Sequence, residues 1–520
     1  MKKRYAVNQL KVGVILSYLA TGLNMLIQLL YTPIMIKLLG QSEYGLYTLV
    51  GSVVSYLSLF SLGFTGAYLR FYSRYRKEGG KESIARLNGL FLTIFLCMAI
   101  VALVCGVTLS HFTPQLFGTK LSKVELEKAK TLMQILVINI ACTFPASVFE
   151  SIVSAHEQYI FQRLLNLGGI VFNPFICLPL LLSGKGSIAV VCVTTGITVG
   201  KLLFNVAFCV KKLQVQFEFR NLNLSLLKEI AGFSFFLFIN MVIDQINWAV
   251  DKFILGRIAG TATVAVYGVG AQINAMYIQF STAISSVFSP RVNRIAAEKD
   301  ATIYKKFTEL FIKVGRIQFL FLGLIVSGFV FFGKYFLTDI YVTSAYVDSY
   351  YVAVLLIVPV TIPLIQNLGI EIQRAVNKHR MRALVYAMMA FVNICISIPL
   401  AVLYGPIGSA LGTSLSLLLA NGIIMNIYYH KQIQIDMIAF WKSIFSLGRG
   451  LVFPIVLGCV ISCGIEFDSI TNYMKWIIVY ILAYAISMWL FGMNTYEKNL
   501  IIHPLKSIWR GRPKNDYHRE

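Results

Sequence analysis

Charged residues are scarce in this chain of 520 residues. Asp, Glu, Lys and Arg together make up 13% of it, whereas hydrophobic residues make up 57%, and the mean hydropathy is +0.72. This composition excludes a soluble globular protein, whose surface would require far more polar side chains. It indicates an integral membrane protein that crosses the bilayer many times. No loop is long enough for a separate soluble domain, and the longest loop predicted on the outer side of the membrane is residues 110–130.

The chain also lacks the motifs of common catalytic and metal sites. No G-x-x-x-x-G-K-[ST] sequence is present, and Gly256–Gly260 lacks the lysine, so no nucleotide-hydrolysing site is predicted. The six histidines are scattered, and the nine cysteines fall in apolar stretches without metal-site spacing. We therefore expect no metal, no cofactor and no disulfide. The sequence predicts a protein that is not an enzyme.

Long apolar runs predict an all-α fold that spans the membrane about fourteen times, because roughly 20 apolar residues suffice to cross a bilayer as a helix. The first run is followed by a short polar hinge at residues 37–45, and a second run comes directly after it. The predicted spans are residues 12–36, 44–68, 87–109, 131–153, 164–183, 187–210, 229–256, 262–288, 311–333, 349–370, 383–404, 407–429, 447–465 and 473–493.

Basic residues are distributed unevenly among the predicted loops. The net charge is +23, and 35 of the 46 Lys and Arg residues lie on the N-terminus, the C-terminal tail and every second loop, against 9 on the alternate loops. Because positive residues are retained on the cytoplasmic side, this split predicts a multi-pass protein of the cytoplasmic membrane with both termini in the cytoplasm. Because the basic residues lie in loops beside the membrane spans, the net positive charge does not indicate binding to nucleic acid, and no nucleic-acid partner is predicted.

The two halves of the chain carry a weak internal repeat, which predicts two pseudo-symmetric six-helix bundles with a central site between them. At an offset of 220 residues the matched pairs are Lys37 and Arg257, Gly40 and Gly260, Tyr47 and Tyr267, Ser61 and Ser281, and Arg74 and Arg294; at an offset of 222, Gly186-Ser187 matches Gly408-Ser409. The predicted domains are an N-terminal bundle (1–212), a C-terminal bundle (213–430), two additional transmembrane helices (431–493) and a basic cytoplasmic tail (494–520).

Polar side chains form stripes along one face of three predicted spans. A charge at the centre of a membrane helix costs about 2.5–3.5 kcal/mol on insertion scales, so such residues are informative. The stripes comprise Asn240, Asp244, Asn247 and Asp251 in the seventh span; Thr194, Thr198, Lys201 and Asn205 in the sixth; and Asn24 and Gln28, with Asn24 equivalent to Asp244 in the repeat, in the first.

We predict that these stripes line a hydrated cavity. The candidates for substrate binding are Lys201, Asn24, Gln28, Asn205 and Asn247, and the candidate ion-coupling carboxylates are Asp244 and Asp251. Candidates for a cytoplasmic gate or for headgroup contacts are Arg70, Arg291, Glu150 and Arg374. The alternative is that these residues satisfy one another between packed helices, for example as an Asp244–Lys201 pair, and that the arginines only reach the headgroups.

Four segments resemble one known family of transporters. They are Pro33–Tyr47, Asp251–Arg257, Val264–Val269 and Phe288–Arg291. The chain is similar there to bacterial polysaccharide flippases, the exporters of undecaprenyl-linked oligosaccharides in the multidrug/oligosaccharidyl-lipid/polysaccharide superfamily. The resemblance implies two six-helix bundles that form a V, here with two added C-terminal spans, and transport by alternating access. It also implies that a basic cavity residue meets the diphosphate, a role that Lys201 fits by position.

The chemistry of such a cargo agrees with the polar stripes. A lipid-linked sugar diphosphate needs a hydrated groove, a cation for its phosphates and a gap for its tail. Without a nucleotide site, turnover would draw on H+ or Na+ coupling or on consumption of the product outside. A drug or cation antiporter of the same superfamily and a flippase for the peptidoglycan-precursor lipid remain alternatives, whereas a membrane glycosyltransferase lacks a catalytic outer loop. We expect the carrier to act as a monomer.

Overall fold

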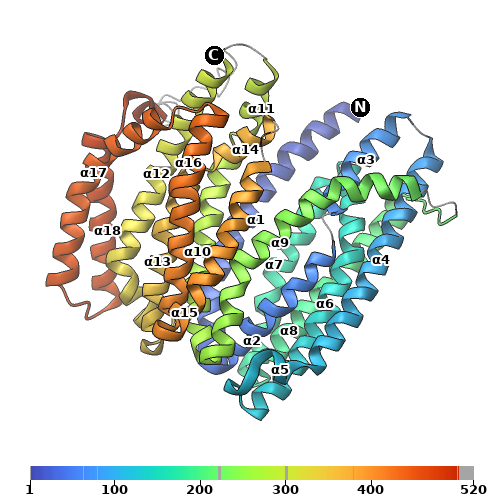
Figure 1. Cartoon of the computed structure of the whole chain (residues 1–520), viewed down its shortest axis with the longest axis horizontal. Coiled ribbons are helices and arrows are strands. Elements are labelled where there is room, and N and C mark those ends of the chain that lie inside the picture. Colours follow the sequence, from blue (N-terminus) through green and yellow to red (C-terminus); the bar gives the residue numbers. More distant parts are fainter. Residues whose placement is uncertain are drawn as a thin grey trace. The chain divides into compact units, whose positions relative to one another are not determined.

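The computed structural model describes residues 2–61, 64–78, 80–220, 224–298, 302–376, 378, 380–500 and 502. Regular structure in these residues is entirely helical, and they contain no strand (Figure 1). The helices are long because the apolar runs between polar loops are long, as in α4 (Lys81–His111) with 31 residues and α6 (Lys123–Ala155) with 33. The predicted all-α, multi-pass membrane fold is confirmed.

The chain divides into two compact units. Two helices, α10 (Thr261–Ser286) and α15 (Arg380–Leu417), each contribute residues to both units. The first unit comprises residues 1–269 and 386–413, and the second comprises residues 270–385 and 414–520. The other helices of the first unit are α1 (Lys2–Leu39), α2 (Gln41–Ser55), α3 (Phe64–Glu78), α4, α5 (Thr113–Phe117), α6, α7 (Tyr159–Leu182), α8 (Gly186–Ala207) and α9 (Leu224–Ala259). Those of the second unit are α11 (Ser289–Ala297), α12 (Ile303–Tyr335), α13 (Val347–Ile365), α14 (Leu368–Ala375), α16 (Met425–Tyr428), α17 (Met437–Gly464) and α18 (Ile470–Ser487).

The core of the first unit lies where α3, α4 and α6 pack together. The rings of Tyr68 and Phe91 meet edge to face with centroids 5.2 Å apart, and the Tyr68 hydroxyl donates to Asn88 Oδ1 at 2.7 Å. Gly106 lets α4 approach α6, because a Cβ there would lie 2.4 Å from the Val137 side chain. Small residues allow membrane helices this close contact, which lipid alone would not drive. Around this core, α1 packs on α7, and α2 packs on both α6 and α9.

The second unit contains the two additional helices expected near the C-terminus. Both α17 and α18 pack against α12, which also contacts α13. One end of this packing is aromatic: the Tyr473 hydroxyl donates to the Phe332 carbonyl at 3.0 Å, and Tyr480 packs edge to face on the Phe332 ring. Near its other end, the buried Tyr484 hydroxyl donates to the Leu320 carbonyl at 2.8 Å. The pair is therefore fixed to α12 by both ring packing and hydrogen bonds.

The number of spans stays a prediction. In the described part of the chain, eleven helical segments are long and apolar enough to cross a membrane. One of them, Met381–Ile433, covers two predicted spans, which are separated by a kink at Gly405 with a φ of +58°. The predicted seventh and eighth spans coincide with α9 and α10, which are not among the eleven. The division into bundles at residues 212 and 430 also stays a prediction, and most of the predicted tail, residues 503–520, lies outside the described residues.

Candidate functional site

A buried carboxylate, Asp251, forms the centre of a polar cluster in the first unit. Its side chain lies on α9 and is 1% exposed. Oδ2 accepts hydrogen bonds from the Tyr267 hydroxyl at 2.7 Å and from Thr413 Oγ1 at 2.8 Å, and Oδ1 accepts one from Ser409 Oγ at 2.9 Å. Three hydroxyls therefore offset part of the cost of burying this carboxylate.

Further polar side chains of α15 lie beside the hydroxyls that bond Asp251. Asn393 Oδ1 accepts from Ser397 Oγ at 2.7 Å and lies 3.2 Å from Thr413 Oγ1, and Ser397 Oγ lies 3.3 Å from the Ser409 carbonyl oxygen. Asn393, Ser397 and Ser409 are fully buried. Tyr267, Ser409 and Thr413 present oxygen atoms to Asp251, and oxygen is the ligand type that hard cations such as Na+ use. We name Asp251, Tyr267, Asn393, Ser397, Ser409 and Thr413 the Asp251 cluster.

Glycines in α15 bring these side chains together. Gly405 takes a positive φ that other residues rarely adopt, and Pro406 follows it, so the helix breaks and a second helix starts there. The two segments then pack closely: a Cβ on Gly408 would lie 1.9 Å from the Leu400 carbonyl oxygen, and one on Gly412 would lie 2.2 Å from Ser397 Oγ. Asn393 and Ser397 on the first segment, and Ser409 and Thr413 on the second, are each four residues apart and therefore lie on the helix faces that meet beside Asp251.

Sequence reasoning found only one member of the Asp251 cluster. Tyr267, Ser409 and the pair Asn393 and Ser397 were not predicted as site residues, although Tyr267 and Ser409 appeared among the residues of the internal repeat. Asn393 and Ser397, like Ser409 and Thr413, are spaced four apart, so each pair shares one helix face. That spacing in an apolar span is the signal that could have found them.

A second polar cluster lies among α6, α7 and α8, around Lys201. Lys201 Nζ donates to Asn166 Oδ1 at 3.3 Å, and the acidic group that interacts with the ammonium is Glu150. Gly169 makes room for this side chain, since a Cβ there would lie 2.3 Å from Lys201 Cε. Asn205, fully buried, donates to the Lys201 carbonyl at 3.0 Å. The Asp244–Lys201 pair considered from the sequence stays a prediction.

The polar column of α8 continues away from Lys201. Asn139 Nδ2 on α6 donates to Thr198 Oγ1 at 3.0 Å, and Asn173 Nδ2 on α7 donates to Thr194 Oγ1 at 3.4 Å. The predicted stripe on α8 is thus packed against two neighbouring helices of its own unit. Glu150, predicted at a gate, and Lys201, predicted in the cavity, meet in one cluster.

The other predicted cavity residues lie on α1 and α9. Asn24 and Gln28 are half-buried, and Asp244 is exposed. Asn247 is 2% exposed, yet neither its amide nitrogen nor its amide oxygen has a hydrogen-bond partner in the described structure. A buried amide without partners is uncommon, so Asn247 has capacity to bond a water molecule or a ligand.

The predicted gate arginines are exposed. Arg70 and Arg291 are accessible, and Arg374 forms an ion pair with Glu371 at 3.0 Å. Glu371 also accepts from Ser289 Oγ at 3.0 Å, which ties α14 to the start of α11. Exposure of the three arginines is compatible with either predicted role, a gate or headgroup contact.

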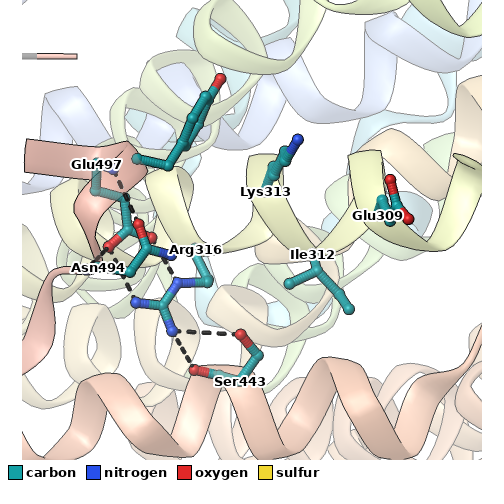
Figure 2. A pocket seen from close by; sticks show the side chains of 8 residues that line it. Glu309, Ile312, Lys313, Arg316, Ser443, Asn494 and Glu497 are labelled. Atoms are coloured by element: carbon teal, nitrogen blue, oxygen red, sulfur yellow. Dashed lines mark hydrogen bonds and ion pairs between the residues drawn. The ribbon is translucent and has the colours of Figure 1, made fainter. Parts of the chain in front are cut away.

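A pocket of about 360 Å³ lies in the second unit, at the charged end of α12 (Figure 2). Its floor is Arg316, which donates to Glu497 Oε1 at 2.5 Å, to Glu497 Oε2 at 3.0 Å and to the Ser443 carbonyl at 2.7 Å. Ser443 Oγ, Ser446 Oγ and the Gly492 carbonyl also accept hydrogen bonds from the guanidinium. The guanidinium is therefore fully bonded within the protein, and we assign this cluster a structural role that holds the chain after α18 against α12 and α17.

These features describe a multi-pass membrane protein with buried polar clusters inside its helix bundles. The chain belongs to the polysaccharide biosynthesis protein family, whose model matches residues 10–296, and the resemblance predicted from the sequence is confirmed. No curated protein matches the chain.

Three solved structures have a similar fold. One is described as the lipid II flippase MurJ in an inward closed conformation, with 16% identity and a TM-score of 0.71, covering 95% of this chain and 99% of that one. A multidrug resistance MATE family transporter of the MOP superfamily, in an inward-facing conformation, gives 14% identity and a TM-score of 0.61, covering 84% and 99%. The Vibrio cholerae MATE transporter VcmN in the bent form gives 12% and 0.53, covering 92% and 99%. At these identities the likeness establishes a shared fold.

Proposed function

We propose that this protein is a flippase that moves an undecaprenyl-diphosphate-linked oligosaccharide, the repeat unit of a cell-surface polysaccharide, from the inner to the outer leaflet. Membership of the polysaccharide biosynthesis family supports the pathway, and the fold it shares with MOP-superfamily transporters supports transport by alternating access. The protein acts as a carrier in the cytoplasmic membrane, not as an enzyme, and requires no cofactor.

The observation that carries the proposed mechanism is the Asp251 cluster. Asp251 is 1% exposed and accepts hydrogen bonds from Tyr267, Ser409 and Thr413. Burial of a carboxylate within a membrane span costs free energy, so such a residue indicates a functional site. Its oxygen donors suit a proton or Na+, either of which would neutralise the charge and strengthen the contact between α9 and the two segments of α15. Asp251 is then the coupling residue, and Asp244, which is exposed, becomes the second candidate.

The cargo contacts that we propose lie on α1, α8 and α9. Lys201 is the basic group for the diphosphate, and its ammonium would exchange its hydrogen bond to Asn166 for the phosphate oxygens. Asn24, Gln28, Asn205 and Asn247 offer amides to the sugar, and Asn247 has both of its amide atoms free of partners in the described structure. Arg70, Arg291 and Arg374 would meet headgroups on the cytoplasmic side.

Two other cargoes are testable alternatives. One solved structure with the same fold is described as a lipid II flippase and others as multidrug transporters, so lipid II and a drug or cation are the two alternatives. A drug or cation antiporter would require an acidic cavity, whereas Lys201 contributes a basic group.

A flipping assay in proteoliposomes distinguishes these cargoes. Purified protein would be reconstituted with a fluorescent undecaprenyl-diphosphate oligosaccharide, with fluorescent lipid II or with a cationic dye, and leaflet transfer would be followed by quenching from outside. We expect transfer of the oligosaccharide lipid and loss of transfer in Lys201→Ala. Transfer of lipid II alone, or of the dye alone, would contradict the proposal.

A further inference from the structure

Three helix N-termini meet at one carboxylate, Glu125, in the first unit. Its Oε1 accepts hydrogen bonds from Ser42 Oγ at 2.7 Å and from Thr261 Oγ1 at 2.8 Å, and those two hydroxyl oxygens lie 3.0 Å apart. Its Oε2 accepts from the Ser122 backbone N–H at 2.9 Å, which completes a capping box at the start of α6. Ser42 lies in the first turn of α2, and Thr261 is the first residue of α10.

A carboxylate is favourable at this position for two reasons. The N-terminus of a helix carries a partial positive charge, so the starts of α2, α6 and α10 all attract the same anion. Hydrogen bonds to an ionised acceptor are also stronger than those between neutral groups. Glu125 is half-buried, which limits the competition from water. The single side chain therefore links three helices that would otherwise present like partial charges to one another.

The helix backbones near Glu125 are closely packed. A Cβ on Gly45 would lie 1.9 Å from the Thr261 carbonyl oxygen, and one on Gly256 would lie 2.5 Å from the Leu49 side chain. The beginning of α2 thus rests directly on the junction between α9 and α10. Both glycines are required by this close approach and not by their own backbone angles.

The link joins the two halves of the internal repeat. Ser42 and Glu125 belong to the first half, and Thr261 belongs to the second, where it follows Gly260, the repeat partner of Gly40. A separate carboxylate, Glu43, has its bonds in the described part of the chain within the first half: it accepts from the Ser187 backbone N–H and from Lys128 Nζ, both at 2.6 Å. Separation of the halves would therefore break the bonds to Thr261 and leave the capping box, the Ser42 bond and the Glu43 contacts intact.

We propose that Glu125, through its hydrogen bonds to Ser42 and Thr261, holds the starts of α2 and α10 together at the end of the protein predicted to face outside. We call this contact the latch, and we infer that it must open before cargo is released on that side. The inference rests on the proposed flippase function, since alternating access requires this end to open and close. Glu125 acts through the two helices and touches no cargo, so it is a positioning residue. Opening exchanges the Thr261 hydroxyl for water at Glu125.

A disulfide across the latch provides the first test. Ser42→Cys and Thr261→Cys would be introduced into a background in which the nine native cysteines are replaced, because hydroxyl oxygens 3.0 Å apart bring the two sulfurs within reach of a bond. We expect the oxidised protein to lose flipping in proteoliposomes and the reducing agent to restore it. Flipping by the fully cross-linked protein at the reduced rate would overturn the latch, whereas absence of flipping in the reduced protein would contradict the proposed function instead.

A conformational readout tests the latch without relying on flipping. Spin labels on Lys185, which precedes the Gly186 that contacts Glu43, and on Ala262, which follows Thr261, report the separation of the two halves by electron double resonance; both residues are exposed. In Thr261→Val, which leaves the capping box intact, the population with the longer distance should rise on the order of tenfold, as expected for loss of one hydrogen bond to a charged group. Glu125→Ala should raise it further.

The control is Glu127→Ala, which removes an exposed carboxylate from the same helix without touching α2 or α10. Its distance distribution should match that of the unmodified protein. Equal distributions for Thr261→Val, Glu125→Ala and Glu127→Ala would overturn the proposal, provided that all three proteins elute as folded monodisperse species.

Discussion

Neutralising Glu497 should destabilise the protein through the buried charge that it leaves behind. Arg316 and Glu497 have side chains that are 6% and 3% exposed, and they are joined by two hydrogen bonds at 2.5 and 3.0 Å (Figure 2). In Glu497→Gln the guanidinium keeps the Ser443 carbonyl but loses its counter-charge. Removing one partner of a buried ion pair costs about 3–5 kcal/mol. Because glutamine retains one acceptor oxygen, we expect a loss near the lower end, about 3 kcal/mol.

The measurement is unfolding in mixed detergent micelles, followed by intrinsic fluorescence under conditions where refolding is reversible. Glu309→Gln is the matched control, because Glu309 lines the same pocket but is exposed, and it should change stability by less than about 0.5 kcal/mol. The double variant Arg316→Met with Glu497→Leu removes both charges, and its free energy of unfolding should lie within about 2 kcal/mol of that of the unmodified protein. The remaining loss reflects the backbone carbonyls that no longer accept a hydrogen bond from Arg316. Equal stabilities of Glu497→Gln and Glu309→Gln would refute the assignment of a buried clamp.

Three further predictions concern the cargo cation, the hairpin in α15 and the topology. Lys201→Ala should abolish flipping while the protein remains folded, and Lys201→Arg should restore part of it, because arginine also binds phosphate; unchanged flipping by stable Lys201→Ala would contradict its role. Gly412→Ala should lower stability by about 1–3 kcal/mol, measured as above, because its Cβ would lie 2.2 Å from Ser397 Oγ; no loss would mean that the two segments of α15 separate easily. Single cysteines at residues 120–130 and at residues 291–316, in a cysteine-free background, should react with an impermeant reagent from opposite sides, and labelling from one side would overturn the predicted span alternation.

The sequence was sufficient to predict the helical membrane fold because long apolar runs have few alternatives in a bilayer. It also singled out Asp251, since a carboxylate within a predicted span is conspicuous. The residues that bond it were harder to find: Asn393 and Ser397 are ordinary polar side chains, and only the sharp turn at Gly405 brings Thr413 back to them.

Pairing between distant residues was the main feature that the sequence could not supply. Lys201 and Glu150 lie on different helices, and periodicity within one helix carries no information about which face meets which neighbour. Arg316 was counted only as one of the basic residues that orient the chain, and its partner Glu497 lies 181 positions further along. The latch at Glu125 was missed for the same reason, because Ser42 and Thr261 are brought together only by the packing of α2 on the α9–α10 junction.

Ion-coupled flipping is tested most directly by Asp251→Asn, which preserves the shape of the side chain and removes its charge. The variant would be reconstituted beside the unmodified protein and Asp244→Asn, and transfer of the fluorescent undecaprenyl-diphosphate oligosaccharide would be measured with no gradient, with a Na+ gradient and with a proton gradient. We predict that one gradient accelerates the unmodified protein and that Asp251→Asn, although folded, flips at a rate that no gradient changes. A folded Asp251→Asn protein that responds to the gradient as the unmodified protein does would contradict the account.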